Sequence, residues 1–202
     1  GKDWEVLNTA IKPLPACHFA HAASDAVRAL LPALENDLEQ VEEIVVRVPA
    51  PVIPVICEPE SQKRRPRTSY EAQFSLPYIV AATLCTGGFG LDELDEKALL
   101  NPRILALADK VRHEADPNSG YPKYFSGEVE LRLMDGRRLR HREDYHRGSG
   151  ARPIERDDII EKFHSTAGRA ISEGHRTNLL NTIENLDSTE NIQTFFDLLS
   201  VP

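Results

Sequence analysis

The chain has 202 residues, of which 41% are hydrophobic and 28% are charged, which is typical of a globular protein with its own core. Its net charge of −8 argues against a nucleic-acid partner or an anionic membrane surface, because such binding needs a basic face. Three widely separated cysteines do not form a secreted disulfide framework, and no apolar run approaches the ~20 residues of a membrane span. We therefore expect a cytoplasmic protein.

The segment 12–21 holds the densest group of reactive side chains, reading Lys-Pro-Leu-Pro-Ala-Cys-His-Phe-Ala-His. Its two prolines disfavour helix before them, so we predict a stiff extended loop. Strong helix formers predict a helix over residues 22–31. The positive end of that helix would lie beside four side chains of the loop: Lys12, Cys17, His18 and His21.

A cationic loop at the start of a helix suits the carboxylate of a substrate. Lys12 and His21 are the candidate catalytic residues, because a desolvated ammonium or imidazole can exchange a proton near neutral pH. Cys17 and His18 are candidates for binding the substrate. The alternative is an ordinary surface loop with a solvated lysine. No metal site is expected, since no second Cys/His pair lies at ligand spacing.

Alternating apolar and polar side chains over residues 41–48 predict a half-buried strand. The prolines at positions 49, 51 and 54 predict an extended segment after it. The basic run at 63–67 is interpreted as a solvated loop, with capture of a phosphate or carboxylate as the alternative. A single helix is expected from an N-cap at Ser69 to the glycines at 87 and 88.

Asn101 and Pro102 form a cap and a first-turn proline, which predicts a helix that extends to about residue 111. Residues 128–133 and 138–141 alternate around Asp135-Gly136 and predict a β-hairpin. His141 and His146 follow among arginines and are expected to be solvated.

The glycines at 148 and 150 predict a flexible joint, and the composition changes beyond it. Three amphipathic helices are expected over residues 157–170, 176–186 and 189–199. The fold class is α+β. Residues 1–150 would form a small α+β domain with a short antiparallel sheet packed by helices, and residues 151–202 a helical segment.

Five stretches in this order resemble the C-terminal part of the MmgE/PrpD family, which includes 2-methylcitrate dehydratases, cis-aconitate decarboxylase and iminodisuccinate epimerase. They are Lys12-x-x-Pro15-x5-His21, Glu71-Ala-Gln-Phe-Ser-x-x-Tyr78, Asn101-Pro102, the Asp135-Gly136 hairpin, and Arg152-Pro-Ile followed by Glu161-Lys-Phe163. The resemblance implies that residues 1–150 are the lid domain of such an enzyme. Residues 151–202 would return to a large helical domain, whose N-terminal part lies outside this chain.

That resemblance implies a cofactor-independent lyase acting on a small di- or tricarboxylate, with the active site between lid and helical domain. Ser75 would be a further substrate-binding residue, with a purely structural role as the alternative. In the decarboxylase of the family, a catalytic histidine falls at Cys17. A thiol there favours a dehydratase, such as 2-methylcitrate dehydratase, or an epimerase.

The resemblance implies three partners: the polycarboxylate substrate, the N-terminal helical domain and a second copy of the protein in a homodimer. It implies no cofactor. The rival hypothesis is a non-catalytic binding or dimerisation module derived from the same family.

Overall fold

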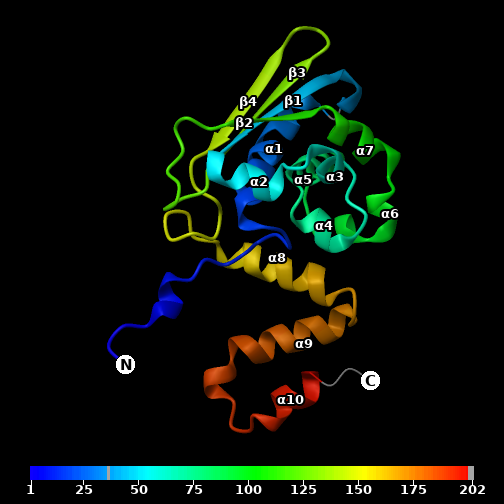
Figure 1. Ribbon diagram of the computed structural model, residues 1–202. Coiled ribbons are helices and arrows are strands. Elements are labelled where there is room, and N and C mark those ends of the chain that lie inside the picture. Colours follow the sequence, from blue (N-terminus) through cyan, green and yellow to red (C-terminus); the bar gives the residue numbers. More distant parts are fainter. Residues whose placement is uncertain (36, 200–202) are drawn as a thin grey trace. The chain divides into compact units, whose positions relative to one another are not determined.

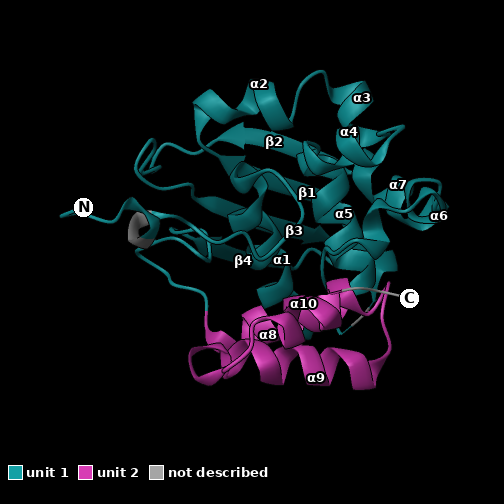
Figure 2. Ribbon diagram, turned by 90° about the horizontal axis from the view of Figure 1, so that it is seen from below, with its two compact units in different colours: residues 1–154 teal, residues 155–202 magenta. Residues whose placement is uncertain are grey.

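The computed structural model describes residues 1–35 and 37–199, apart from the side chains at positions 7 and 8. The described chain divides into two compact units, residues 1–154 and 155–202 (Figure 2). The division falls four residues beyond the predicted boundary at residue 150.

A four-stranded sheet organises the first unit, in the order β2-β1-β3-β4. The strands are β1 (Val41–Val48), β2 (Val111–Ala115), β3 (Gly127–Leu133) and β4 (Arg138–Glu143). β1 pairs antiparallel with β3 and parallel with β2, and β3 and β4 form the predicted hairpin. The mixed α/β composition with a mostly antiparallel sheet confirms the α+β class.

Apolar side chains of β1 and β3 form one face of this sheet. Ile44 lies opposite Leu131 and Val46 opposite Val129, and all four are fully buried. Helices α1 (His21–Leu34) and α5 (Leu76–Thr86) belong to the same core, and α1 lies against β3 and β4 (Figure 1). The period-two pattern of residues 41–48 therefore gave the correct buried face.

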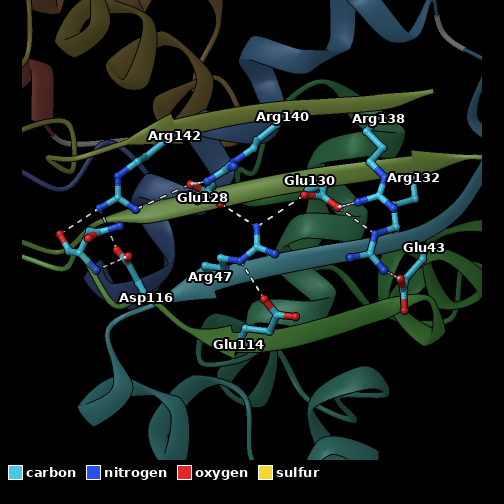
Figure 3. Close-up of polar contacts among 11 residues, drawn as sticks. Glu43, Arg47, Glu114, Asp116, Glu128, Glu130, Arg132, Arg138, Arg140 and Arg142 are labelled. Carbon is cyan, nitrogen blue, oxygen red and sulfur yellow. Dashed lines mark hydrogen bonds and ion pairs between the residues drawn. The ribbon is translucent and has the colours of Figure 1, made fainter. Parts of the chain in front are cut away.

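The opposite face of the sheet carries a ladder of ion pairs (Figure 3). Arg47 lies at the centre, with its guanidinium 2.7 Å from both Glu114 and Glu128. Arg140 bonds the same Glu128 from β4, and this carboxylate is only 3% exposed. The Arg47 and Arg140 hydrogen bonds hold the pKa of Glu128 below its usual value against the effect of desolvation. This face is polar by composition but largely closed to water at its centre.

Short helices fill the connections between the strands. They are α2 (Ile53–Ile56), α3 (Glu60–Arg64), α4 (Ser69–Gln73), α6 (Glu96–Leu99) and α7 (Pro102–Asp109), with 3-10 turns at Glu5–Asn8, His18–Ala20, Leu38–Gln40, Ala50–Val52 and Asp92–Leu94. The α7 cap is as predicted, since the Asn101 side chain accepts from the Arg103 amide at 3.0 Å. The turns after residue 49 are helical, so the prediction of an extended segment there is wrong.

The basic run at 63–67 is also more ordered than predicted, because its first residues complete α3. The Lys63 ammonium donates to the carbonyls of Val55 and Phe74 at 2.6 and 2.7 Å. Arg64 donates to the carbonyl of Val111, and Arg65 pairs with Asp109. These cations tie neighbouring connections together.

The second unit consists of α8 (Arg156–Ala167), α9 (Glu173–Glu184), a 3-10 turn (Leu186–Ser188) and α10 (Gln193–Leu199). These three α-helices correspond to the helices predicted over residues 157–170, 176–186 and 189–199, although most of their first and last residues differ from the predicted ones. Among the described residues of this unit, Leu179 is the one buried apolar side chain, whereas Ile159, Ile183 and Phe196 are each more than two fifths exposed. Within the described part of the chain, no helix combines the length and apolar character needed to cross a membrane.

Candidate functional site

The loop that carries Lys12 is fixed to the core at its far end and enters α1 through a 3-10 turn. The Cys17 amide donates to the Gln73 carbonyl at 2.8 Å, and the turn His18–Ala20 leads into α1, whose first residue is His21. The predicted loop and helix start are therefore confirmed, with the helix beginning one residue earlier than expected.

The two predicted catalytic residues, Lys12 and His21, converge on one backbone oxygen. The Lys12 ammonium donates to the carbonyl of Ala16 at 3.2 Å, and His21 Nε2 lies 3.2 Å from the same oxygen. Because a carbonyl can only accept, His21 carries its proton on Nε2 and a lone pair on Nδ1. The sequence spacing thus brings the cation and the base to a common point.

His21 is fully buried, and its Nδ1 has no hydrogen-bond partner among the described residues. Burial lowers the pKa of this imidazole from 6.5 to about 3, and the neighbouring His18 contributes in the same direction. At neutral pH the ring is therefore uncharged, with an unoccupied lone pair.

His18 lies between neighbouring imidazoles and is half-buried. Its ring is in edge contact with that of His21, with 4.7 Å between the ring centroids. Burial, then the imidazole of His146 and the ammonium of Lys12, lower its pKa from 6.5 to about 4. His18 Nε2 is likewise without a partner in the part of the chain that the structure describes.

The segment after the hairpin completes this region, and sequence reasoning missed it. The Ile11 amide donates to the Gly148 carbonyl at 3.0 Å, which joins the segment directly to the residue before Lys12. Gly148 has φ of +88°, and a Cβ there would lie 1.9 Å from the Ile11 carbonyl oxygen. The predicted flexible joint is therefore, at Gly148, a tightly packed crossing of two backbone segments.

A buried carboxylate anchors the same segment to α1. Asp25 follows His21 by one helical turn and is 6% exposed. Arg147 donates to one carboxylate oxygen of Asp25 at 3.2 Å, and Arg152 lies 3.7 Å from the other. The spacing of His21 and Asp25, one turn apart at the start of α1, is the sequence signal that places both on one face of the helix.

The other predicted binding residues differ in their placement. Cys17 is half-buried and packs against the core at the start of the site. Ser75 is fully buried; its hydroxyl accepts from the Tyr78 amide at 3.2 Å and donates to the carbonyl of Lys63. Ser75 is thus the N-cap of α5, and the helix predicted over 69–86 breaks there into α4 and α5. Its hydroxyl is hydrogen-bonded within the fold, as the alternative of a purely structural role for Ser75 expects.

Of the two histidines near the hairpin, only one is solvated. His141 is 39% exposed and lies 3.1 Å from a carboxylate oxygen of Glu143. His146 is 4% exposed, so the prediction of solvation is wrong for this residue. No group of three or more His, Cys, Asp or Glu side chains among the described residues is arranged to hold a metal ion.

A family model and several known proteins are similar to this chain over most of its length. The MmgE/PrpD C-terminal domain matches residues 14–188. Cis-aconitate decarboxylase of Homo sapiens is 27% identical over 96% of this chain, and that of Mus musculus is 26% identical over 96%. A cis-aconitate decarboxylase-like protein of Aspergillus oryzae is 23% identical over 99% of this chain.

The chain spans 40% of the length of the human and mouse relatives and 42% of the fungal one. The match to the domain covers most of the 202 residues, from just after Lys12 through the second helix of the C-terminal unit. The chain therefore belongs to the MmgE/PrpD family.

Proposed function

We propose that this chain is the C-terminal part of a lyase that acts on a small di- or tricarboxylate, with proton transfer at a carbon next to a carboxylate. The observation that carries the proposal is the convergence of Lys12 and His21 on the Ala16 carbonyl, which sets an ammonium beside an imidazole with a free lone pair. The curated relatives, named as cis-aconitate decarboxylases, support the substrate class.

The proposed chemistry divides the work between a cation and a base. The Lys12 ammonium would pair with a substrate carboxylate, or donate a proton, where negative charge develops in the transition state. His21 Nδ1 would accept or return the proton, because its tautomer is fixed by the bond from Nε2 to Ala16. His18 lies against His21 and is the less buried of the two imidazoles, so it would face the substrate.

The reaction type rests on Cys17, which stands where the resemblance places a histidine in the decarboxylase of the family. A thiol is a poorer proton donor to a carbanion than an imidazolium, so we favour dehydration of a 2-methylcitrate-like substrate. Assays of the intact protein with 2-methylcitrate and with cis-aconitate separate dehydration from decarboxylation, since only the latter releases carbon dioxide.

The decisive variant is Lys12→Ala in the intact protein. Loss of a positioned acid or charge stabiliser should lower turnover by about 10²-fold or more. Lys97→Ala, an exposed lysine on α6, is the matched control and should retain wild-type turnover. Wild-type turnover in Lys12→Ala would remove Lys12 from the mechanism, and no turnover of any polycarboxylate by the intact wild type would remove the lyase.

The alternative, a binding or dimerisation module, is favoured by the second unit taken alone. Its helices leave Ile159, Ile183 and Phe196 each more than two fifths exposed, and an apolar surface of this kind is typical of an interface. We propose that the N-terminal helical domain of the family, and a second copy in a homodimer, cover such side chains. Light scattering of the chain tests this point: a monomer without self-association would contradict it.

A further inference from the structure

His146 is buried among aromatic rings, and the proposed lyase chemistry assigns no role to this residue. Its ring stacks on Phe125, with 5.0 Å between the centroids and 22° between the planes. On another side it meets the ring of His18, also at 5.0 Å. His18 contacts His21, so the three imidazoles form one continuous group, here called the histidine cluster (His18, His21 and His146).

Each member of the histidine cluster has one buried ring nitrogen without a hydrogen-bond partner in the described chain. These atoms are His18 Nε2, His21 Nδ1 and His146 Nδ1. Buried polar atoms are nearly always paired, so three open positions within one cluster point to a molecule that supplies several polar atoms at once.

The charges around the cluster identify the sign of that molecule. Lys12 brings positive charge to His18 and His21. The nearby carboxylate of Asp25 is balanced by Arg147 and Arg152, and its Oδ2 makes no hydrogen bond within the described chain. The described part of the chain therefore supplies the cluster with one cation, Lys12, while its nearby carboxylate is paired with arginines. Two kinds of polar atom fit this environment: a negatively charged acceptor beside Lys12, such as a carboxylate oxygen, and a donor such as a hydroxyl group for the lone pair of His21 Nδ1.

We propose that His146 is a third imidazole of the site and donates a hydrogen bond from Nδ1 to a carboxylate oxygen of the bound polycarboxylate. The inference rests on the proposed function for the class of ligand, and it adds a specificity-determining residue from the segment after β4. Burial lowers the pKa of His146, so the ring stays neutral and can donate without carrying a charge of its own.

Three variants separate this role from a packing role. His146→Phe keeps an aromatic ring against Phe125 but removes both nitrogens. His146→Asn places an amide nitrogen near the position of Nδ1 and restores the donor. His141→Phe is the matched control, because the His141 side chain is 39% exposed, is hydrogen-bonded to Glu143 and is not a member of the histidine cluster.

The measurement is calorimetric binding of citrate and of cis-aconitate to the intact protein at neutral pH, with the melting temperature of each variant recorded without ligand. A hydrogen bond to a charged group corresponds to a roughly 10- to 100-fold change in affinity. We expect His146→Phe to lose about that much, His146→Asn to stay within about threefold of wild type, and His141→Phe to bind as wild type.

Wild-type affinity in His146→Phe overturns the inference. The partner of His146 Nδ1 would then be an ordered water and not the ligand. Equal losses in His146→Phe and His146→Asn, at unchanged melting temperature, overturn the donor role. If wild type turns over a polycarboxylate while His146→Phe binds it normally, this inference fails alone. If wild type neither binds nor turns over any of these acids, the proposed function fails with it.

Discussion

The burial of His21 predicts that the chain loses stability in mild acid. The pKa of His21 is near 3 in the folded chain and has its ordinary value of 6.5 in the unfolded chain. Between these two values, the unfolded chain therefore binds a proton that the folded chain does not bind. The stabilisation by neutral His21 is therefore complete above about pH 6.5 and is lost progressively as the pH falls towards the folded value. Between about pH 7.5 and pH 5, this single imidazole should lower the free energy of unfolding by about 2 kcal/mol.

The assay is urea unfolding of the chain followed by far-ultraviolet circular dichroism at the two pH values. His21→Gln is the informative variant, because its amide nitrogen can keep the bond to the Ala16 carbonyl but does not titrate. Its stability should fall by about 2 kcal/mol less than that of wild type over the same interval. His141→Gln, with a 39% exposed imidazole in wild type, should follow the wild-type curve. Identical pH dependence in wild type and His21→Gln would refute the burial of a neutral imidazole at this position.

Two further predictions concern the surroundings of the site and the far face of the sheet. Gly148→Ala should lower the free energy of unfolding by about 2 kcal/mol or more, because the residue has a left-handed φ and a Cβ there would meet the Ile11 carbonyl. Gly150 has open space around it, so Gly150→Ala should melt at the wild-type temperature in a thermal scan. Arg47→Ala should lower the free energy of unfolding, measured in urea, by about 2–3 kcal/mol, because it removes one of the cations that pair with the buried Glu128. Arg138 is 67% exposed, so Arg138→Ala should lower it by at most about 1 kcal/mol. Equal losses in the two variants would contradict this argument.

The elements that the sequence predicted well are those whose signals are local. The hairpin follows from alternation on both sides of Asp135-Gly136, where Gly136 adopts φ of +84°, and the α7 start follows from Asn101 and Pro102. Strand β1 follows from its period of two. In each case the chemistry that decides the structure lies within a few residues of the place it decides.

Strand β2 was missed because nothing local requires it. Only Val111 of its five residues is buried, and the polar residues that follow would fit a loop equally well. The strand exists because its backbone pairs in parallel with the edge of β1, from Ile44 opposite Val111 to Val48 opposite Ala115. Pairing of this kind is set by the tertiary arrangement and overrides weak local preference.

The same distinction explains which parts of the candidate site could be predicted. Lys12, Cys17, His18 and His21 lie on one short loop, so their proximity follows from the sequence alone. His146 reaches them only because the chain crosses Ile11 at Gly148 and because Arg147 and Arg152 hold Asp25. The burial of His146 depends on contacts with Phe125 and His18, which are both distant from it in the sequence. No local pattern around residue 146 predicts those contacts. A charged, glycine-containing segment therefore looked like a solvated joint, although its glycine and its arginines are what fix it to the site.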